Sequence, residues 1–213
     1  MKTDRLIEML GTNVEPVNRQ TLPTSLASAV LLGGVAAFCL MLGTVSFRSD
    51  LAARASLTFV AVKLLFALTV IGTGLVFLSR AMRPGHDTRR PFQFAFLPFL
   101  VVGLAAVSEL ALGFTTAPHP MTTGTHWLLC LYCIPLFAVI PFISLVWALR
   151  LGAPTNLTRA GAMAGLVAGA VGSAAYAFHC PDDSLPFIAL WYGASISLCG
   201  AVGALVGPRV LRW

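Results

Sequence analysis

The sequence predicts an all-helical membrane protein, built as a bundle of six transmembrane helices. The 213 residues are 57% hydrophobic and only 10% charged, whereas an ordinary soluble domain carries roughly 25% charged residues. Six sustained apolar runs follow a polar start, and each is long enough to cross a hydrocarbon core about 30 Å thick. Because every backbone amide in lipid must be satisfied internally, runs of this length are expected to be helices.

The chain divides into a polar N-terminal segment, residues 1–23, and a membrane domain, residues 24–213. The first apolar run is too long for the hydrophobic region of a signal peptide, so the N-terminal segment is expected to stay attached. The predicted spans cover residues 24–47, 56–78, 92–114, 127–149, 160–178 and 187–206. Short loops connect them, which leaves little chain for a soluble catalytic domain.

Basic residues predict the orientation in the membrane. With both termini placed in the cytoplasm, eleven Lys and Arg residues fall on cytoplasmic segments, and only Arg48 and Arg54 fall on outer loops. Basic residues gather on the cytoplasmic side of membrane proteins. The sequence therefore predicts a multi-pass membrane protein with both termini on the cytoplasmic side. The net charge of +6 is explained by this topology rather than by binding to nucleic acid.

Two charged residues lie inside the predicted spans at similar depths. Lys63 lies about 10 Å from the outer end of the second span, and Glu109 lies about 8 Å from that of the third, at a rise of about 1.5 Å per residue. Buried charges at like depth usually pair, which predicts an ion pair between Lys63 and Glu109. The alternative is that each side chain extends separately to the interface.

A stripe of small residues runs along the fifth span, where Gly161, Gly165 and Gly169 follow one another at four-residue spacing. Small residues at this spacing let two helix backbones approach closely. The stripe predicts packing against another helix of the same chain, with homodimerisation as the alternative.

Reactive side chains gather at the outer surface. Cys130 and Cys133 lie near the outer end of the fourth span, after His126, and Cys180 follows His179 at the outer end of the fifth span. Thiols on this side of the membrane meet oxidising conditions, so a disulfide of Cys180 with Cys130 or Cys133 is physically plausible. Thiolates and imidazoles also bind soft metal ions. No resident cofactor is predicted, but Cys130, Cys180, His126 and His179 are candidate ligands for a transient heavy-metal ion.

Acidic and hydroxyl side chains precede the sixth span, at Asp182, Asp183 and Ser184. Such residues favour a helix N-terminus, because its free amides and its dipole attract negative charge. The sequence predicts a turn and a helix cap here, with metal contact as the alternative for the two aspartates.

No motif of enzyme chemistry is present. The sequence CLYC at residues 130–133 lies on a membrane helix, outside the βαβ setting that a thioredoxin-type motif requires. Nucleophile-elbow, Walker, HExxH and dinucleotide-binding motifs are absent. The sequence therefore predicts that the protein is not an enzyme, and the alternative is a small membrane thiol oxidoreductase.

A short amphipathic helix is predicted in the N-terminal segment, where Leu6, Ile7 and Leu10 share one side and Thr3 or Asp4 caps the start. Such a helix lies on the lipid surface or docks in a groove of a soluble partner. The modest basic content of the segment favours the partner.

Five stretches of the chain form a recognisable set. They are MKTDRLIEML at the start, MRPG after the second span, RLGAP after the fourth, GAMAGLVAGAVGSAAYAFHCPDDSLPFIALWYG across the fifth and sixth, and GALVGPRVLRW at the end. Together they resemble the NrsF-like anti-sigma factors over nearly the whole chain. The resemblance implies a six-span inner-membrane protein that holds an extracytoplasmic-function sigma factor inactive.

The resemblance also implies roles for particular residues. Two outward cysteines are expected to sense thiol-reactive or heavy-metal stress; the second is Cys180, and the first is most naturally Cys130, with Cys133 left open. A change at these cysteines is expected to shift the fourth and fifth spans and to loosen the hold on the sigma factor. The residues expected to contact the sigma factor are Asp4, Arg5, Leu6, Ile7 and Leu10.

Overall fold

The computed structural model describes residues 21–49, 53–83, 89–112 and 124–212, together with the single positions 3, 11 and 122. Within this part of the chain the regular structure is entirely helical. The predicted contact residues Asp4, Arg5, Leu6, Ile7 and Leu10 lie outside the described residues. The helices are α2 (Thr21–Thr44), α3 (Arg54–Ala81), α4 (Arg89–Phe94), α5 (Leu97–Ala111), α7 (Trp127–Leu149), α8 (Leu157–Tyr176), α9 (Leu185–Phe187), η1 (Ile188–Tyr192) and α10 (Gly193–Val210).

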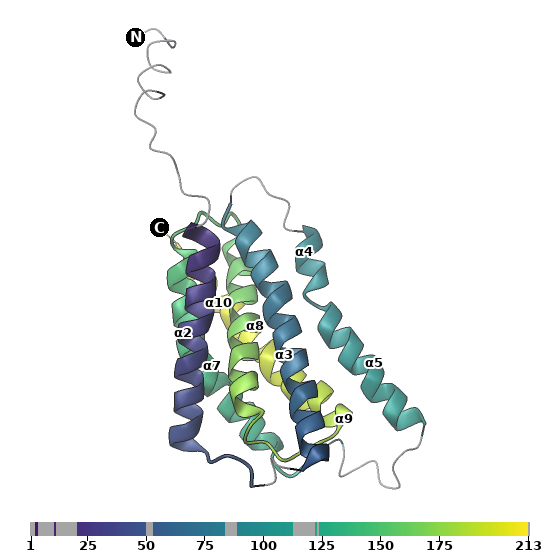
Figure 1. Ribbon diagram of the computed structural model, residues 1–213. Coiled ribbons are helices and arrows are strands. Elements are labelled where there is room, and N and C mark those ends of the chain that lie inside the picture. The colour runs from purple at the N-terminus through teal and green to yellow at the C-terminus, as the bar shows by residue number, and fades with distance from the viewer. Residues whose placement is uncertain are drawn as a thin grey trace.

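The long helices run side by side as one bundle around α8 (Figure 1). Helices α2, α3, α7 and α10 all pack against α8. Most side chains of α8 are consequently buried, and Met163, Val167 and Tyr176 are fully so. Helix α5 stands at the edge of the bundle and leans away from it (Figure 1).

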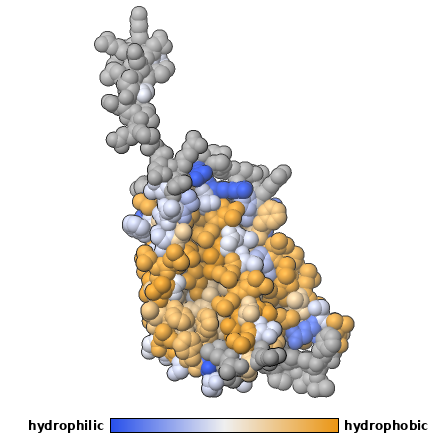
Figure 2. Space-filling view, in the orientation of Figure 1, coloured by the Kyte–Doolittle hydropathy of each residue, from blue (hydrophilic) through white to orange (hydrophobic). Residues whose placement is uncertain are grey.

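Five helical stretches are long and apolar enough to cross a membrane. They are Thr21–Thr44, Ser56–Ala81, Pro91–Ala111, Trp127–Leu149 and Leu185–Val210. Hydrophobic side chains cover most of the visible flank of the bundle, and hydrophilic ones gather toward its ends (Figure 2). The all-helical prediction is confirmed. The fifth predicted span, residues 160–178, corresponds to α8, which is rich in glycine and alanine and is not among these five.

The third predicted span, residues 92–114, is broken into α4 and α5. Pro98 is the second residue of α5. Proline disfavours helical backbone at the residue before it and has no N–H to donate to the carbonyl four residues earlier. Phe94 therefore ends α4, and Ala95 and Phe96 form the turn between the two helices.

The glycine stripe of α8 faces α10 within the same chain. A Cβ at Gly165 would lie against the backbone carbonyl of Cys199, and one at Gly161 would lie against that of Gly203. From the other side, a Cβ at Gly207 would lie 2.8 Å from the Cα of Gly161. The two backbones approach so closely that this stripe is occupied by α10 and is not open to a second copy.

Substitution of Gly165 by leucine is expected to destabilise the bundle strongly. Neighbouring backbone cannot move aside as a flexible side chain can, so overpacking should cost about 3 kcal/mol. Unfolding of the detergent-purified protein measures the loss. Gly72→Leu is the matched control, because a Cβ at Gly72 meets no atom within 4 Å. Equal stability of the two variants would contradict the close α8–α10 contact.

Candidate functional site

Three connections converge at one end of the bundle, at the bottom of Figure 1. They are the link from α2 to α3, the residues that lead into α7, and the link from α8 to α9. Backbone hydrogen bonding joins two of them, since the amide of Arg48 donates to the carbonyl of Phe178 at 3.2 Å. Residues distant in the sequence are thereby gathered into one buried polar site.

Two cysteine side chains meet in this site. Cys130, in the first turn of α7, and Cys180, in the link after α8, are both fully buried. Their thiols are close enough to interact directly, and neither is in a disulfide. Cys133 lies one turn further along α7, is only partly buried, and is also a free thiol. Of the two candidate partners, the structure therefore places Cys130 beside Cys180.

The environment of Cys180 favours its thiolate. The hydrogen bond from Cys130 and the nearby Lys63 ammonium lower the pKa of the Cys180 thiol from its usual value, although burial opposes the shift. The thiolate is the form that reacts with oxidants and binds metals. Cys180 is accordingly the member of the pair whose thiolate the surroundings favour.

A fully buried lysine contacts the backbone of Cys180 directly. Lys63 Nζ donates to the carbonyl oxygen of Cys180 at 3.0 Å and to Asp183 Oδ1 at 2.9 Å. Its side chain has no exposed surface, and the ammonium lies 5.8 Å from the centre of the Tyr192 ring. A charge this deep is tolerated only with a counterion and hydrogen bonds, which Asp183 and the carbonyl supply.

Arg48 completes the cluster from the link after α2. Its guanidinium donates to Asp183 Oδ2 at 2.8 Å, to Asp183 Oδ1 at 3.0 Å and to the carbonyl of Cys180 at 3.1 Å. It also donates to Ser56 Oγ at 3.1 Å, at the start of α3. Two cations thus share one carboxylate and one carbonyl oxygen, so Arg48, Lys63 and Asp183 together carry a charge of +1 next to the dithiol. We call these three residues the ion cluster.

The predicted ion pair of Lys63 with Glu109 is wrong. Lys63 is paired with Asp183, whereas Glu109 Oε2 accepts a hydrogen bond from the backbone N–H of Leu185 at 3.2 Å. The two residues do lie near the same end of the bundle, but α5 leans away from α3 (Figure 1). The link after α8 folds inward instead and brings Asp183 to the depth of Lys63.

The neighbouring acid, Asp182, has a separate task as the cap of α7. Its carboxylate accepts hydrogen bonds from the backbone N–H of His126 at 2.9 Å and of Thr125 at 3.1 Å. These free amides at the helix start gain an acceptor from a distant part of the chain. Ser184 caps the next helix, as predicted, since its Oγ accepts from the N–H of Phe187 at 3.3 Å.

Two tyrosines close the site on its inner side. Tyr176 ends α8, and Tyr192 lies in the π-helical turn η1; both are fully buried, and their ring centres lie 6.2 Å apart. Their hydroxyl oxygens have no hydrogen-bond partner of normal geometry in the described part of the chain. Single π-helical turns occur often at functional sites, and this one places Tyr192 over Lys63.

The two candidate histidine ligands are engaged elsewhere. The imidazole of His179 lies 2.6 Å from the carbonyl oxygen of Ser46, and that of His126 lies 2.7 Å from Thr125 Oγ1. Among the described residues, no group of three His, Cys, Asp or Glu side chains is placed to hold one metal ion. A soft ion would therefore find two ligands here, the thiols of Cys130 and Cys180.

Four residues of the site were not assigned to it from the sequence. Arg48 and Asp183 could have been suggested as partners, because the predicted topology puts both on loops at the end of the span that carries a buried lysine. Tyr176 and Tyr192 gave no signal, because aromatic residues near a span end are common.

The fold and this site define a helical protein of the membrane type, with a buried dithiol tied to charged residues at one end. Comparison with known proteins gives the family. Residues 10–213 match the family described as "NrsF: Negative regulator of sigma F". Two relatives, the "Probable anti-sigma-F factor NrsF" of Azospira oryzae and the "Anti-sigma-F factor NrsF" of Caulobacter vibrioides, are each 33% identical over 218 residues, covering the whole of both chains. No solved structure matches.

The chain belongs to the NrsF family of negative regulators of sigma F. The resemblance found in the sequence is confirmed, and so is the prediction that the protein is not an enzyme, because the family and both relatives are regulatory proteins.

Proposed function

We propose that this chain is a membrane-bound anti-sigma factor that sequesters an extracytoplasmic-function sigma factor and releases it when Cys130 and Cys180 react. Family membership supports the first half. The second half rests on one observation, the contact of two buried thiols, one from α7 and one from the link after α8, that lie next to an ion cluster.

The proposed topology has six spans in a bacterial inner membrane: the five apolar stretches and α8, which is the fifth span in chain order. A central helix that is surrounded by other helices can be less apolar than a helix that faces lipid. The excess of basic residues on one set of loops supports cytoplasmic termini. This orientation places the dithiol at the outer end of the bundle and the N-terminal segment, residues 1–23, at the inner end.

Two chemical events would change the dithiol. An oxidant that accepts two electrons would join the sulfur atoms of Cys130 and Cys180 in a disulfide and release two protons. A soft, thiophilic metal ion would bind both sulfur atoms as thiolates and displace the same two protons. The +1 charge of the ion cluster favours either route, because it stabilises the thiolate that starts each one.

The ion cluster offers a path from the dithiol to the helices that lead to the N-terminal segment. Lys63 and Arg48 bind the carbonyl oxygen of Cys180 itself, so a movement of Cys180 disturbs bonds to α3 and to the end of α2. Helix α2 follows directly on the N-terminal segment. Release of the sigma factor requires that these helices have a second packing arrangement. Reaction of the dithiol needs to stabilise that arrangement over the first by only a few kcal/mol.

Deletion of residues 2–12 should free the sigma factor in unstressed cells, because the proposed contact residues are removed while the bundle is left intact. A transcriptional reporter for the sigma factor measures this, and affinity purification of the intact protein identifies the bound partner. Membrane levels of the deletion variant provide the control. Continued repression by a normally inserted variant would exclude the N-terminal segment as the binding element.

A further inference from the structure

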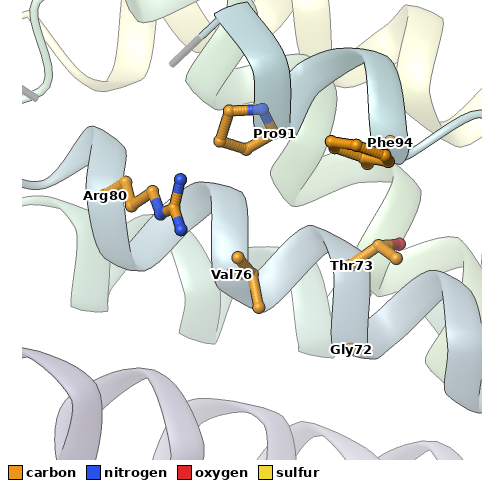
Figure 3. Close-up of a pocket in the computed structure, with 6 residues that line it drawn as sticks. All are labelled: Gly72, Thr73, Val76, Arg80, Pro91 and Phe94. Atoms are coloured by element: carbon orange, nitrogen blue, oxygen red, sulfur yellow. The ribbon is translucent and has the colours of Figure 1, made fainter. Parts of the chain in front are cut away.

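A groove runs between α3 and the broken helix α4–α5, where the edge of the bundle opens (Figure 3). It encloses roughly 350 Å³. Among the residues that the structure describes, its lining is apolar except for a threonine and an arginine, and contains no acidic residue. The residues are Gly72, Thr73, Val76, Arg80, Pro91 and Phe94.

A positively charged side chain, that of Arg80, lies at one end of the groove. Arg80 is exposed, lies in the last turn of α3, and extends toward α4 across the groove (Figure 3). Within the described part of the chain, no carboxylate pairs with its guanidinium, and no acceptor receives a hydrogen bond from it. A planar guanidinium binds phosphate oxygens by paired hydrogen bonds, so this end of the groove is suited to an anion.

The rest of the groove is suited to a hydrocarbon chain. Val76 of α3 and Pro91 and Phe94 of α4 supply its apolar side chains, and Phe94 lies opposite Thr73 (Figure 3). Gly72 leaves its floor open, since a Cβ there would meet nothing within 4 Å. The outer face of α5 next to it is strongly apolar, with Leu100, Leu104 and Val107 each about 60% exposed. The groove therefore opens sideways onto the surface that faces lipid in the proposed membrane orientation.

We propose that this groove binds one anionic phospholipid, with its phosphate on Arg80 and an acyl chain beside Gly72, Val76 and Phe94. Basic pockets between transmembrane helices on the cytoplasmic side bind anionic head groups. The proposal rests on the membrane orientation but not on sigma-factor binding or thiol chemistry.

A lipid in this position would join the leaning helix α5 to α3. Helix α5 reaches the outer site, because Glu109 near its end accepts the hydrogen bond from Leu185 at the start of α9. Phe99 also packs edge to face on Phe66 of α3, with ring centres 5.4 Å apart. The bound lipid would thus hold in place a helix that supports the link carrying Cys180.

Native mass spectrometry of the full-length protein tests the head-group contact. Phosphatidylglycerol is added to the detergent-purified protein, with phosphatidylcholine of the same acyl chains for comparison. Arg80→Gln should bind phosphatidylglycerol about fivefold more weakly than wild type, the loss expected for one basic side chain at a lipid head group. Arg209→Gln, which removes an equal charge from α10 outside the groove, should bind normally. Equal binding by the two variants, or equal binding of the two lipids by wild type, would overturn the proposal.

A second pair of variants tests the acyl-chain contact. Gly72→Phe should fill the groove without a clash and strongly reduce binding of phosphatidylglycerol. Gly103→Phe is the matched control, because a Cβ at Gly103 also meets nothing within 4 Å and Gly103 does not line the groove. Thermal unfolding shows that both variants are folded. Normal lipid binding by folded Gly72→Phe protein would place the lipid elsewhere and refute the proposal.

Discussion

Replacement of Asp183 by alanine is expected to lower the free energy of unfolding by about 3–5 kcal/mol, because it leaves two buried cations without their shared counterion. Lys63 has no exposed surface and Arg48 almost none, so neither charge can reach water without moving the helix or link that carries it. Thermal or denaturant unfolding of the detergent-purified protein measures the loss. This is the largest stability effect expected for any single side chain of the site.

The adjacent acid is the matched control. Asp182→Ala removes the same charge one residue away, but it breaks contacts to Thr125 and His126 at the start of α7, and the loss of such a cap is worth about 1 kcal/mol. Adding Lys63→Met to Asp183→Ala should recover part of the lost stability, since one of the two uncompensated charges disappears. An Asp183→Ala variant no less stable than Asp182→Ala would show that the ion cluster is not closed as described.

Double substitution of Cys130 and Cys180 by serine should abolish induction by thiol-reactive agents or heavy metals while repression in unstressed cells persists. The reason is that serine keeps the size and polarity of the buried pair but can form neither a disulfide nor a strong bond to a soft metal ion. A reporter for the sigma factor, read before and after the stress, measures both properties.

Cys133→Ser is the matched control for this pair. It removes a thiol one helical turn from Cys130 that is not paired with Cys180, so induction should be unchanged. Loss of induction in Cys133→Ser with a normal response in the double variant would reverse the assignment of the sensing thiols.

The positions of individual helices were predictable, because each helix carries its own run of apolar residues. The span at residues 127–149 coincides with α7, Trp127–Leu149, because its apolar run is bounded by polar residues at both ends. The break within the third span was not predicted, although Pro98 signalled it. The packing of the stripe at Gly161, Gly165 and Gly169 followed from spacing, but α10 as its partner did not, because spacing carries no information on which helix is adjacent.

The site that holds Cys130 and Cys180 was only partly predictable, for a geometric reason. Topology fixes the depth of a residue but not its direction around the helix axis or the distance between two helices. Depth therefore brought Cys130 and Cys180 to the same end and favoured Cys130 over Cys133, which lies a turn deeper, without excluding Cys133. Similar depth alone also suggested Glu109 as the ion-pair partner of Lys63. The actual partner is Asp183, which lies on the link between α8 and α9 that folds inward between the helices.

The most direct measurement is release of the sigma factor from the purified complex with the full-length protein. The complex is immobilised and treated with diamide, an oxidant that accepts two electrons from paired thiols, and the sigma factor that elutes is quantified. Mass spectrometry reports the Cys130–Cys180 disulfide in the same sample. Release from wild type together with disulfide formation, and retention by the Cys130→Ser/Cys180→Ser protein, is the expected result. A wild-type complex that forms the disulfide and keeps its sigma factor would contradict the proposed link between the dithiol and sigma-factor release.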